Sequence, residues 1–212
     1  MNKKKVLVLA PHTDDAEIGC GGTISFLKRN DYEIYIAAFS SAADSLPSHM
    51  SKDTLANEYL VSADRMEVVT PEKYLYNYPV RIFKDHRQEI LDILIGLRND
   101  IRPNIVLLPA TSDFHQDHQV ISEEGIRAFK NSTILGYELP WNHNEFSCNY
   151  FFHLSEIDIN NKWEYMSSYK SQVELGRGYF VKDKIFSWAK MRGLQCNSVY
   201  AECFEHIRSN IY

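Results

Sequence analysis

Histidine and aspartate side chains gather in two short segments of this 212-residue chain. Each segment follows an apolar run, 5–10 in one case and 105–108 in the other, that predicts a buried strand. In open α/β sheets, ligands bind beyond the carboxyl ends of the strands, so side chains from both segments are expected to meet there. The candidate residues are His12, Asp14 and Asp15 in the first segment and His115, Asp117 and His118 in the second.

These residue types suit a metal centre that performs hydrolysis. Zinc is commonly bound by three nitrogen or oxygen ligands and keeps a fourth position for water. One aspartate and two neutral histidines leave positive charge on such a site, which lowers the pKa of bound water from about 15.7 to about 7. The adjacent carboxylates of Asp14 and Asp15 point in different directions, so one can bind metal while the other handles protons. Together the two segments indicate a metal site, which neither alone would do.

The surrounding pattern predicts an α/β fold. Strand and helix patterns alternate over about the first 130 residues, which favours βαβ units and a mostly parallel sheet with helices on both faces. No linker or internal repeat interrupts the chain, so we expect a single domain over residues 1–212. The expected strands are 5–10, 33–39, 105–108, 134–137, 150–154 and 199–207, and the expected helices are 19–29, 55–68, 87–97, 119–129, 162–169 and 182–190.

Composition excludes several classes of protein. The net charge of -5 gives no footprint for nucleic acid or an anionic membrane. No apolar stretch approaches the roughly 20 residues of a membrane span. The four cysteines, Cys20, Cys148, Cys196 and Cys203, form no C-x-x-C pair and no dense disulfide framework, so we expect a cytoplasmic protein. The oligomeric state stays open, with a homo-oligomer among the alternatives.

Both segments resemble motifs of one enzyme family. Residues 11–23, PHTDDAEIGCGGT, are similar to the P-H-x-D-D-x-E-x-G-x-G-G-T signature of PIG-L or LmbE-like deacetylases, and residues 115–118 are similar to that family's H-x-D-H motif. Further similarity extends over nearly the whole chain. The resemblance implies a Rossmann-like fold, zinc, and hydrolysis of an N-acetyl group on an amino sugar or glycoconjugate. The additional matching segments are 104–109, 137–138, 170–172, 192–193 and 200–204.

The resemblance also implies a ligand set. His12, Asp15 and His118 match the family's metal ligands. Zinc is the expected ion, although two histidines and one aspartate also accept iron, cobalt or manganese. Cys20 lies near these residues in the sequence, but a small apolar residue packed in a glycine turn is the simpler interpretation.

Catalytic roles follow from the same match. Asp14 is expected to act as the general base on metal-bound water. His115 is expected to stabilise the oxyanion or protonate the leaving nitrogen. Asp117 is expected to orient His115 or His118, as carboxylates commonly do for metal-site imidazoles.

Some positions leave the substrate open. The family often carries an arginine three residues before the position of Glu58, where this chain has Leu55. Arg81 is as suited to a sugar hydroxyl or phosphate as to a structural ion pair. The polar loop Ser40–Ser51 is either a mobile surface loop or a substrate loop. Alternatives to an amino-sugar deacetylase are a metal hydrolase of another amide or ester, such as a thiol-conjugate amide, and a catalytically inactive sugar-binding member.

Overall fold

The computed structural model describes residues 3–210, which form one six-stranded sheet and seven α-helices. No helix in this range is both long and apolar enough to cross a membrane. The strands are β1 (Lys5–His12), β2 (Glu33–Ser40), β3 (Ile105–Pro109), β4 (Thr133–Tyr137), β5 (Tyr150–Leu154) and β6 (Tyr200–Arg208). The helices are α1 (Asp15–Arg29), α2 (Thr54–Met66), α3 (Arg87–Ile101), α4 (Gln116–Ala128), α5 (Glu156–Met166), α6 (Lys170–Glu174) and α7 (Lys182–Gln195).

The sheet is mixed, with a parallel part formed by the first four strands. The spatial order is β2-β1-β3-β4-β6-β5. Strands β1 to β4 pair in parallel, whereas β6 runs antiparallel to both β4 and β5. The predicted α/β fold with a mostly parallel, Rossmann-like sheet is confirmed. The antiparallel edge was not predicted, because the residue pattern of β6 indicated a strand but not the direction in which it runs.

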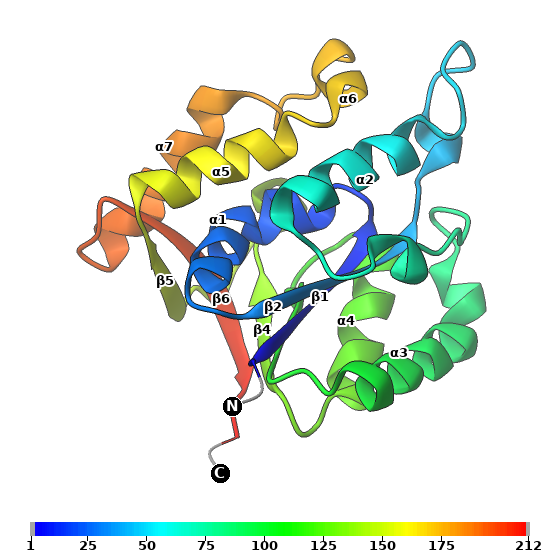
Figure 1. The fold of residues 1–212 in the computed structure, drawn as a ribbon, viewed down its shortest axis with the longest axis horizontal. Coiled ribbons are helices and arrows are strands. Elements are labelled where there is room, and N and C mark those ends of the chain that lie inside the picture. The colour runs from blue at the N-terminus through cyan, green and yellow to red at the C-terminus, as the bar shows by residue number, and fades with distance from the viewer. Residues whose placement is uncertain (1–2, 211–212) are drawn as a thin grey trace.

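Helices cover both faces of the sheet (Figure 1). Side chains alternate along β1: Val6 and Val8 pack with α1, α2, α5 and α7, while Leu7 and Leu9 pack with α3 and α4. A strand buried on both sides needs apolar residues at every position, which explains the unbroken apolar run of β1. The two core layers hold the strand ends rigidly in place.

Helix α1 begins earlier than the glycine pattern suggested. It starts at Asp15, inside the first motif, and continues past a kink at Cys20, whose φ of −146° is not helical. Gly19 permits a close approach at this point, because a Cβ there would lie 2.4 Å from the Tyr137 ring. Gly19 therefore serves close packing of α1 against the sheet rather than a turn before the helix.

The C-terminal part differs most from expectation. Helix α5 begins at Glu156, because Ser155 and Asp158 form a reciprocal capping box in a stretch without strong apolar periodicity. Cys148 and Cys203 form a disulfide across 55 residues of sequence. The spacing of these cysteines in the sequence does not predict the disulfide. They meet because the segment before β5 packs antiparallel against β6. Cys20 and Cys196 are free.

Candidate active site

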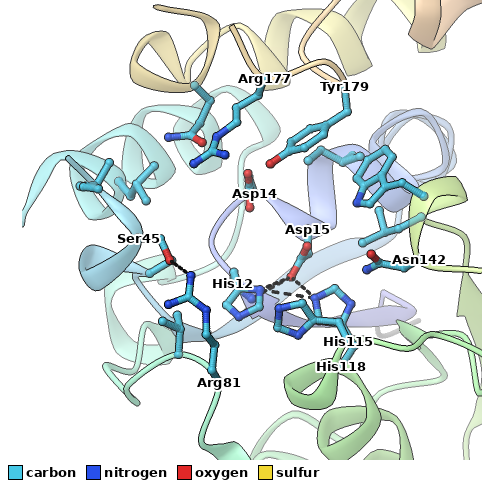
Figure 2. Close-up of a pocket in the computed structure, with 18 residues that line it drawn as sticks. His12, Asp14, Asp15, Ser45, Arg81, His115, His118, Asn142, Arg177 and Tyr179 are labelled. Atoms are coloured by element: carbon cyan, nitrogen blue, oxygen red, sulfur yellow. Dashed lines mark hydrogen bonds and ion pairs between the residues drawn. The ribbon is translucent and has the colours of Figure 1, made fainter. Parts of the chain in front are cut away.

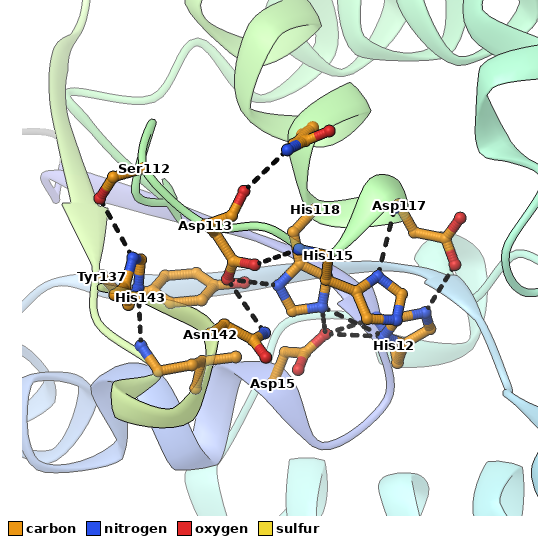
Figure 3. A network of polar contacts seen from close by, with 12 residues as sticks. His12, Asp15, Ser112, Asp113, His115, Asp117, His118, Tyr137, Asn142 and His143 are labelled. Atoms are coloured by element: carbon orange, nitrogen blue, oxygen red, sulfur yellow. Dashed lines mark hydrogen bonds and ion pairs between the residues drawn. The ribbon is translucent and has the colours of Figure 1, made fainter. Parts of the chain in front are cut away.

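Both motifs lie at the carboxyl edge of the parallel strands. His12 is the last residue of β1, and Asp15 is the first residue of α1. Strand β3 is the parallel neighbour of β1, and the loop after it leads into α4, whose first turn carries His118. Because the two strands end side by side, the imidazole and carboxylate groups converge (Figure 3).

Three side-chain atoms form a nearly equilateral triangle. Asp15 Oδ2 lies 3.2 Å from His12 Nδ1 and 3.3 Å from His118 Nε2, and the two nitrogens are 3.4 Å apart. Tetrahedral zinc binds such atoms at about 2.0–2.1 Å, which places neighbouring ligand atoms about 3.3–3.4 Å apart. The spacing and chemistry of these donors fit one small divalent cation.

Two further carboxylates set the tautomers of the histidines. Asp117 Oδ2 lies 3.0 Å from His12 Nε2, and Asp113 Oδ2 lies 2.9 Å from His118 Nδ1. A proton on each of these outer nitrogens leaves the lone pairs of the inner nitrogens directed at Asp15. The Asp117 carboxylate thus contacts His12 instead of His115 or His118, because the first turn of α4 turns it toward β1. Asp113 takes the place expected for Asp117 beside His118.

The charges around the triangle favour a cation at its centre. Burial lowers the pKa of His118, but the charges and hydrogen bonds of Asp15 and Asp113 outweigh it and raise the pKa to about 10. Burial raises the pKa of Asp15, yet His118 and His12 beside it hold that pKa far below its usual range. The negative potential attracts protons and divalent cations alike, so the two compete for the same nitrogen lone pairs.

Asp14 faces the cavity beside the triangle (Figure 2). It precedes the first residue of α1 but caps no backbone group with its side chain. Burial and the charge of Asp15 raise the pKa of Asp14 to about 6. A carboxylate with a pKa near neutrality is suited to accept and return a proton at neutral pH.

His115 is neutral and presents a donor. Burial, together with the charges of His118 and His12, lowers the pKa of His115 to about 4. Its Nδ1 accepts a hydrogen bond from the Asp117 backbone N–H at 3.2 Å, so the proton sits on Nε2. The ring therefore offers an N–H that can stabilise negative charge on an oxygen in the cavity.

The structure offers two overlapping sets of metal ligands. Ligand atoms of His12, His115 and His118 lie within 4.8 Å of one another, and Asp15 joins His12 and His118 in the tighter triangle. The lone pair of His115 already accepts from Asp117, and its other nitrogen carries a proton. Asp15, which the motif match implied as a ligand, lies well within this 4.8 Å distance of both His12 and His118.

A cavity of about 240 Å³ opens above these groups. Arg81 and the Ser40–Ser51 loop, through Ala42, Ser45 and Leu46, line it. Trp141 is 45% exposed and stacks on Tyr179, with ring centroids 4.4 Å apart and planes at 17°. The remaining lining residues are His12, Asp14, Asp15, Ile18, Leu55, Val80, His115, His118, Leu139, Asn142, Gln172 and Arg177.

Other residues singled out from the sequence have structural contacts. Tyr137 is buried, and its hydroxyl donates to the Leu9 carbonyl at 3.1 Å, so it belongs to the core. The Cys20 thiol donates to the Ala16 carbonyl one turn earlier in α1, so Cys20 is a packed residue of this helix and not a member of the triangle of possible metal ligands. Glu58 accepts hydrogen bonds from the backbone and hydroxyl of Ser171, which joins α2 to α6.

Sequence reasoning missed four residues of the site. Asp113 stands two residues before His115 in the second motif segment. An aspartate at this spacing can form a turn by accepting from the backbone N–H, as Asp113 does from His115 at 2.8 Å, and that spacing was the available signal. Asn142 donates to Asp113 from a loop that carries no motif. Arg177 and Tyr179 come from the segment between α6 and α7, where only the flanking glycines mark a turn.

Solved structures of several proteins share this fold. The conserved protein TT1542 from Thermus thermophilus is 19% identical, with a TM-score of 0.78 over 98% of this chain and 96% of that one. N,N'-diacetylchitobiose deacetylase from Pyrococcus horikoshii is 22% identical, with a TM-score of 0.77 over 96% and 84%. GalB, the 4-carboxy-2-hydroxymuconate hydratase from Pseudomonas putida, is 17% identical, with a TM-score of 0.76 over 99% and 98%. These likenesses establish the fold, and the hydratase shows that the fold alone does not determine the reaction.

The family assignment rests on the sequence itself. The PIG-L family, described as GlcNAc-PI de-N-acetylase, matches residues 7–129. That range is more than half of the chain and includes both motifs and every atom of the triangle. The family resemblance is therefore confirmed: the chain belongs to the PIG-L family of de-N-acetylases.

Proposed function

We propose that this chain is a metal-dependent deacetylase, with zinc as its ion, that removes the N-acetyl group from an amino sugar or glycoconjugate. The observation that carries the proposal is the triangle of Asp15 Oδ2, His12 Nδ1 and His118 Nε2, with edges of 3.2–3.4 Å. Both histidines have their tautomers set by buried carboxylates, as expected for metal ligands. We infer that residues 1–212 act as one catalytic domain, because both core layers share a single sheet.

His12, Asp15 and His118 would hold the ion. When bound, a divalent cation supplies Lewis acidity, which polarises a carbonyl and lowers the pKa of water to about 7. Two imidazoles and one carboxylate also suit iron, cobalt or manganese, so the donor set supports a divalent metal and metal analysis must identify it.

The chain's own residues move the protons. Asp14, with a pKa of about 6, is mainly ionised at neutral pH and accepts a proton from the attacking water. The same carboxyl, now protonated, lies in the cavity where the leaving nitrogen needs a proton. His115 donates its Nε2–H to the carbonyl oxygen as that oxygen gains negative charge. Asp117 and Asp113 hold His12 and His118 in position.

The cavity wall supports a sugar substrate. Trp141 presents an exposed indole face that Tyr179 holds in place by stacking. Aromatic faces of this kind pack against the apolar C–H surface of a sugar ring, while polar groups around them bind hydroxyls. The diacetylchitobiose deacetylase that shares the fold gives independent support for an acetylated amino sugar.

Metal analysis and acetate release test the proposal together. We expect about one zinc or iron per wild-type chain and loss of that metal in Asp15→Ala. We also expect acetate release from N-acetylglucosamine derivatives by the wild type but not by Asp15→Ala. Asp183→Ala is the matched control, since Asp183 is an exposed acid in the first turn of α7, as Asp15 is in the first turn of α1. A wild-type chain that takes up no metal from added zinc would refute the proposal.

A further inference from the structure

Two arginines in the cavity have no carboxylate partner. Arg81 and Arg177 both line the cavity, and within residues 3–210 neither has a carboxylate oxygen within 4.0 Å. Among the described residues, the hydrogen bond of the Arg81 guanidinium is to the Ser45 hydroxyl, at 3.5 Å. In contrast, Arg29 and Arg192 pair with buried acids elsewhere in the fold. Among residues 3–210, the cavity thus holds two cationic side chains that form no ion pair.

Arg81 is held in a left-handed backbone conformation, with φ of 72°. An arginine pays conformational energy for this geometry, and such residues concentrate where a site requires them. The Arg81 N–H donates to Asp117 Oδ2 at 2.7 Å, and the same oxygen lies 3.0 Å from His12 Nε2. One carboxylate therefore fixes both a histidine of the triangle and the point from which the Arg81 side chain enters the cavity.

Arg177 enters the cavity from a different loop. It lies between Gly176, with φ of 65°, and Gly178, and its N–H donates to the Gln172 carbonyl at 3.2 Å. Figure 2 shows its side chain reaching into the cavity beside Tyr179 and Asp14, while Arg81 reaches in beside Ser45. Two loops that are far apart in the sequence thus direct their guanidinium groups into the same cavity.

We propose that Arg81 and Arg177 form an anion-binding subsite for a phosphoryl or carboxylate group carried by the amino-sugar substrate. The proposal rests on the proposed function and names the substrate class more closely. Guanidinium groups bind oxyanions through paired, charge-assisted hydrogen bonds. Arg81 and Arg177 enter the cavity from separate loops, so together they can orient the substrate as well as bind it.

Binding measurements separate the subsite from catalysis. Calorimetry in an Asp14→Asn background, which blocks turnover, compares N-acetylglucosamine 1-phosphate, N-acetylmuramic acid and neutral N-acetylglucosamine. We expect at least one anionic sugar to bind about tenfold more tightly than the neutral sugar, as charge-assisted hydrogen bonds allow. The arm that shows the preference identifies phosphoryl or carboxylate as the group recognised.

The variants that test the subsite are chosen to suit the backbone conformation at each arginine. Arg81→Gly removes the guanidinium while glycine keeps the left-handed conformation, and Arg177→Met removes the second charge. Each is expected to reduce the preference several-fold, and the double variant to abolish it. Arg102→Gly is the control, because Arg102 is also left-handed, with φ of 54°, but lies at the opposite edge of the sheet. Melting temperatures verify that each variant folds.

The outcomes distinguish the two proposals. Equal binding of all three sugars, or a preference that survives in the double variant, overturns the anion subsite. If the preference is intact but wild-type enzyme releases acetate from none of the sugars, the subsite stands and the deacetylase proposal fails. Equal acetate release from all three sugars without any binding preference supports the deacetylase and refutes the subsite.

Discussion

A polar hollow lies at each edge of the sheet, and the two differ in the side chains that line them. Among residues 3–210, the larger hollow lacks the cluster of histidine and aspartate side chains that the smaller one contains. The hollow at the amino edge, of about 720 Å³, is lined by Lys4, Arg98 and Arg102 among others. Its arginines contact the carbonyls of Ala128 and Asn99, which are groups near the ends of helices. The carboxyl-edge cavity, of about 240 Å³, instead joins ionisable side chains from separate elements. Convergent side chains, and not volume, distinguish a site from a surface depression.

The largest effect should come from the proton acceptor in the smaller cavity. Asp14→Asn removes the general base, so acetate release should fall by about 10²–10⁴-fold while the metal stays bound. Arg98→Met in the larger hollow should leave the rate unchanged, because within residues 3–210 that side chain bonds to a helix-end carbonyl and a neighbouring amide, away from the site. Steady-state rates with metal analysis of each variant provide the measurement. Wild-type turnover by Asp14→Asn would remove Asp14 from the mechanism.

A smaller effect should follow from the carboxylate behind His118. Asp113→Asn keeps the shape of the site but weakens the acceptor of the His118 Nδ1 proton, so zinc affinity should fall about 10–100-fold. Competition with a coloured zinc chelator measures the affinity. Asp158→Asn is the control, because Asp158 is equally buried but contacts Arg29 and the Ser155 cap instead. An unchanged affinity in Asp113→Asn would show that the negative charge of Asp113 does not contribute to metal binding through His118.

Two helix glycines differ in the space around them, because Gly19 is buried and Gly96 is exposed. A Cβ at Gly19 in α1 would lie 2.4 Å from the Tyr137 ring, whereas Gly96 in α3 has no atom within 4 Å. Gly19→Ala should therefore lower the free energy of unfolding by about 1–3 kcal/mol through overpacking. Gly96→Ala should raise it by about 0.5–1 kcal/mol. Denaturant melts compare the two, and a Gly19→Ala protein as stable as wild type would show that the Tyr137 ring can move aside.

A pH-dependent effect on stability is expected at Asp158, which lies away from both hollows. Burial raises the pKa of Asp158, but hydrogen bonds from Arg29, Ser155 and Ser25 outweigh it and hold the pKa below its usual range. The stabilisation is therefore complete above the unfolded pKa of about 4 and is lost as pH falls through the folded pKa. Asp158→Asn should cost about 1–3 kcal/mol at pH 7 and less below pH 4. A stability difference that does not depend on pH would exclude this ion pair as its source.

Local pattern predicted the parts of the site that depend on one segment. Apolar runs located β1 and β3, and the residues after them reached the same edge because parallel neighbours end side by side. The pairing of Asp117 with His12 and of Asp113 with His118 was not predictable in this way. It depends on which face of α4 meets β1, and the first-turn geometry that decides this leaves no periodic signal.

Elements that depend on distant partners also escaped the sequence pattern. Helix α1 starts before its glycines, and the first of them, Gly19, packs against Tyr137 on β4, which is more than 100 residues away. The direction of β6 and the Cys148–Cys203 bond arise from antiparallel pairing at the sheet edge. Arg177 and Tyr179 reach the cavity only because α6 and α7 place their loop over it.

The three bonds to the Asp117 carboxylate also have a consequence for folding. Asp117 on α4 contacts His12 on β1 and the backbone of Arg81 and Phe83, so it connects segments 36 and 105 residues apart in the chain. The unfolded chain cannot assemble such a site, and any ligand held there binds only the native state. At a concentration one hundred times its dissociation constant, that ligand adds about 2.7 kcal/mol to stability by mass action. Thermal stability then reports the occupancy of the site without any knowledge of the substrate.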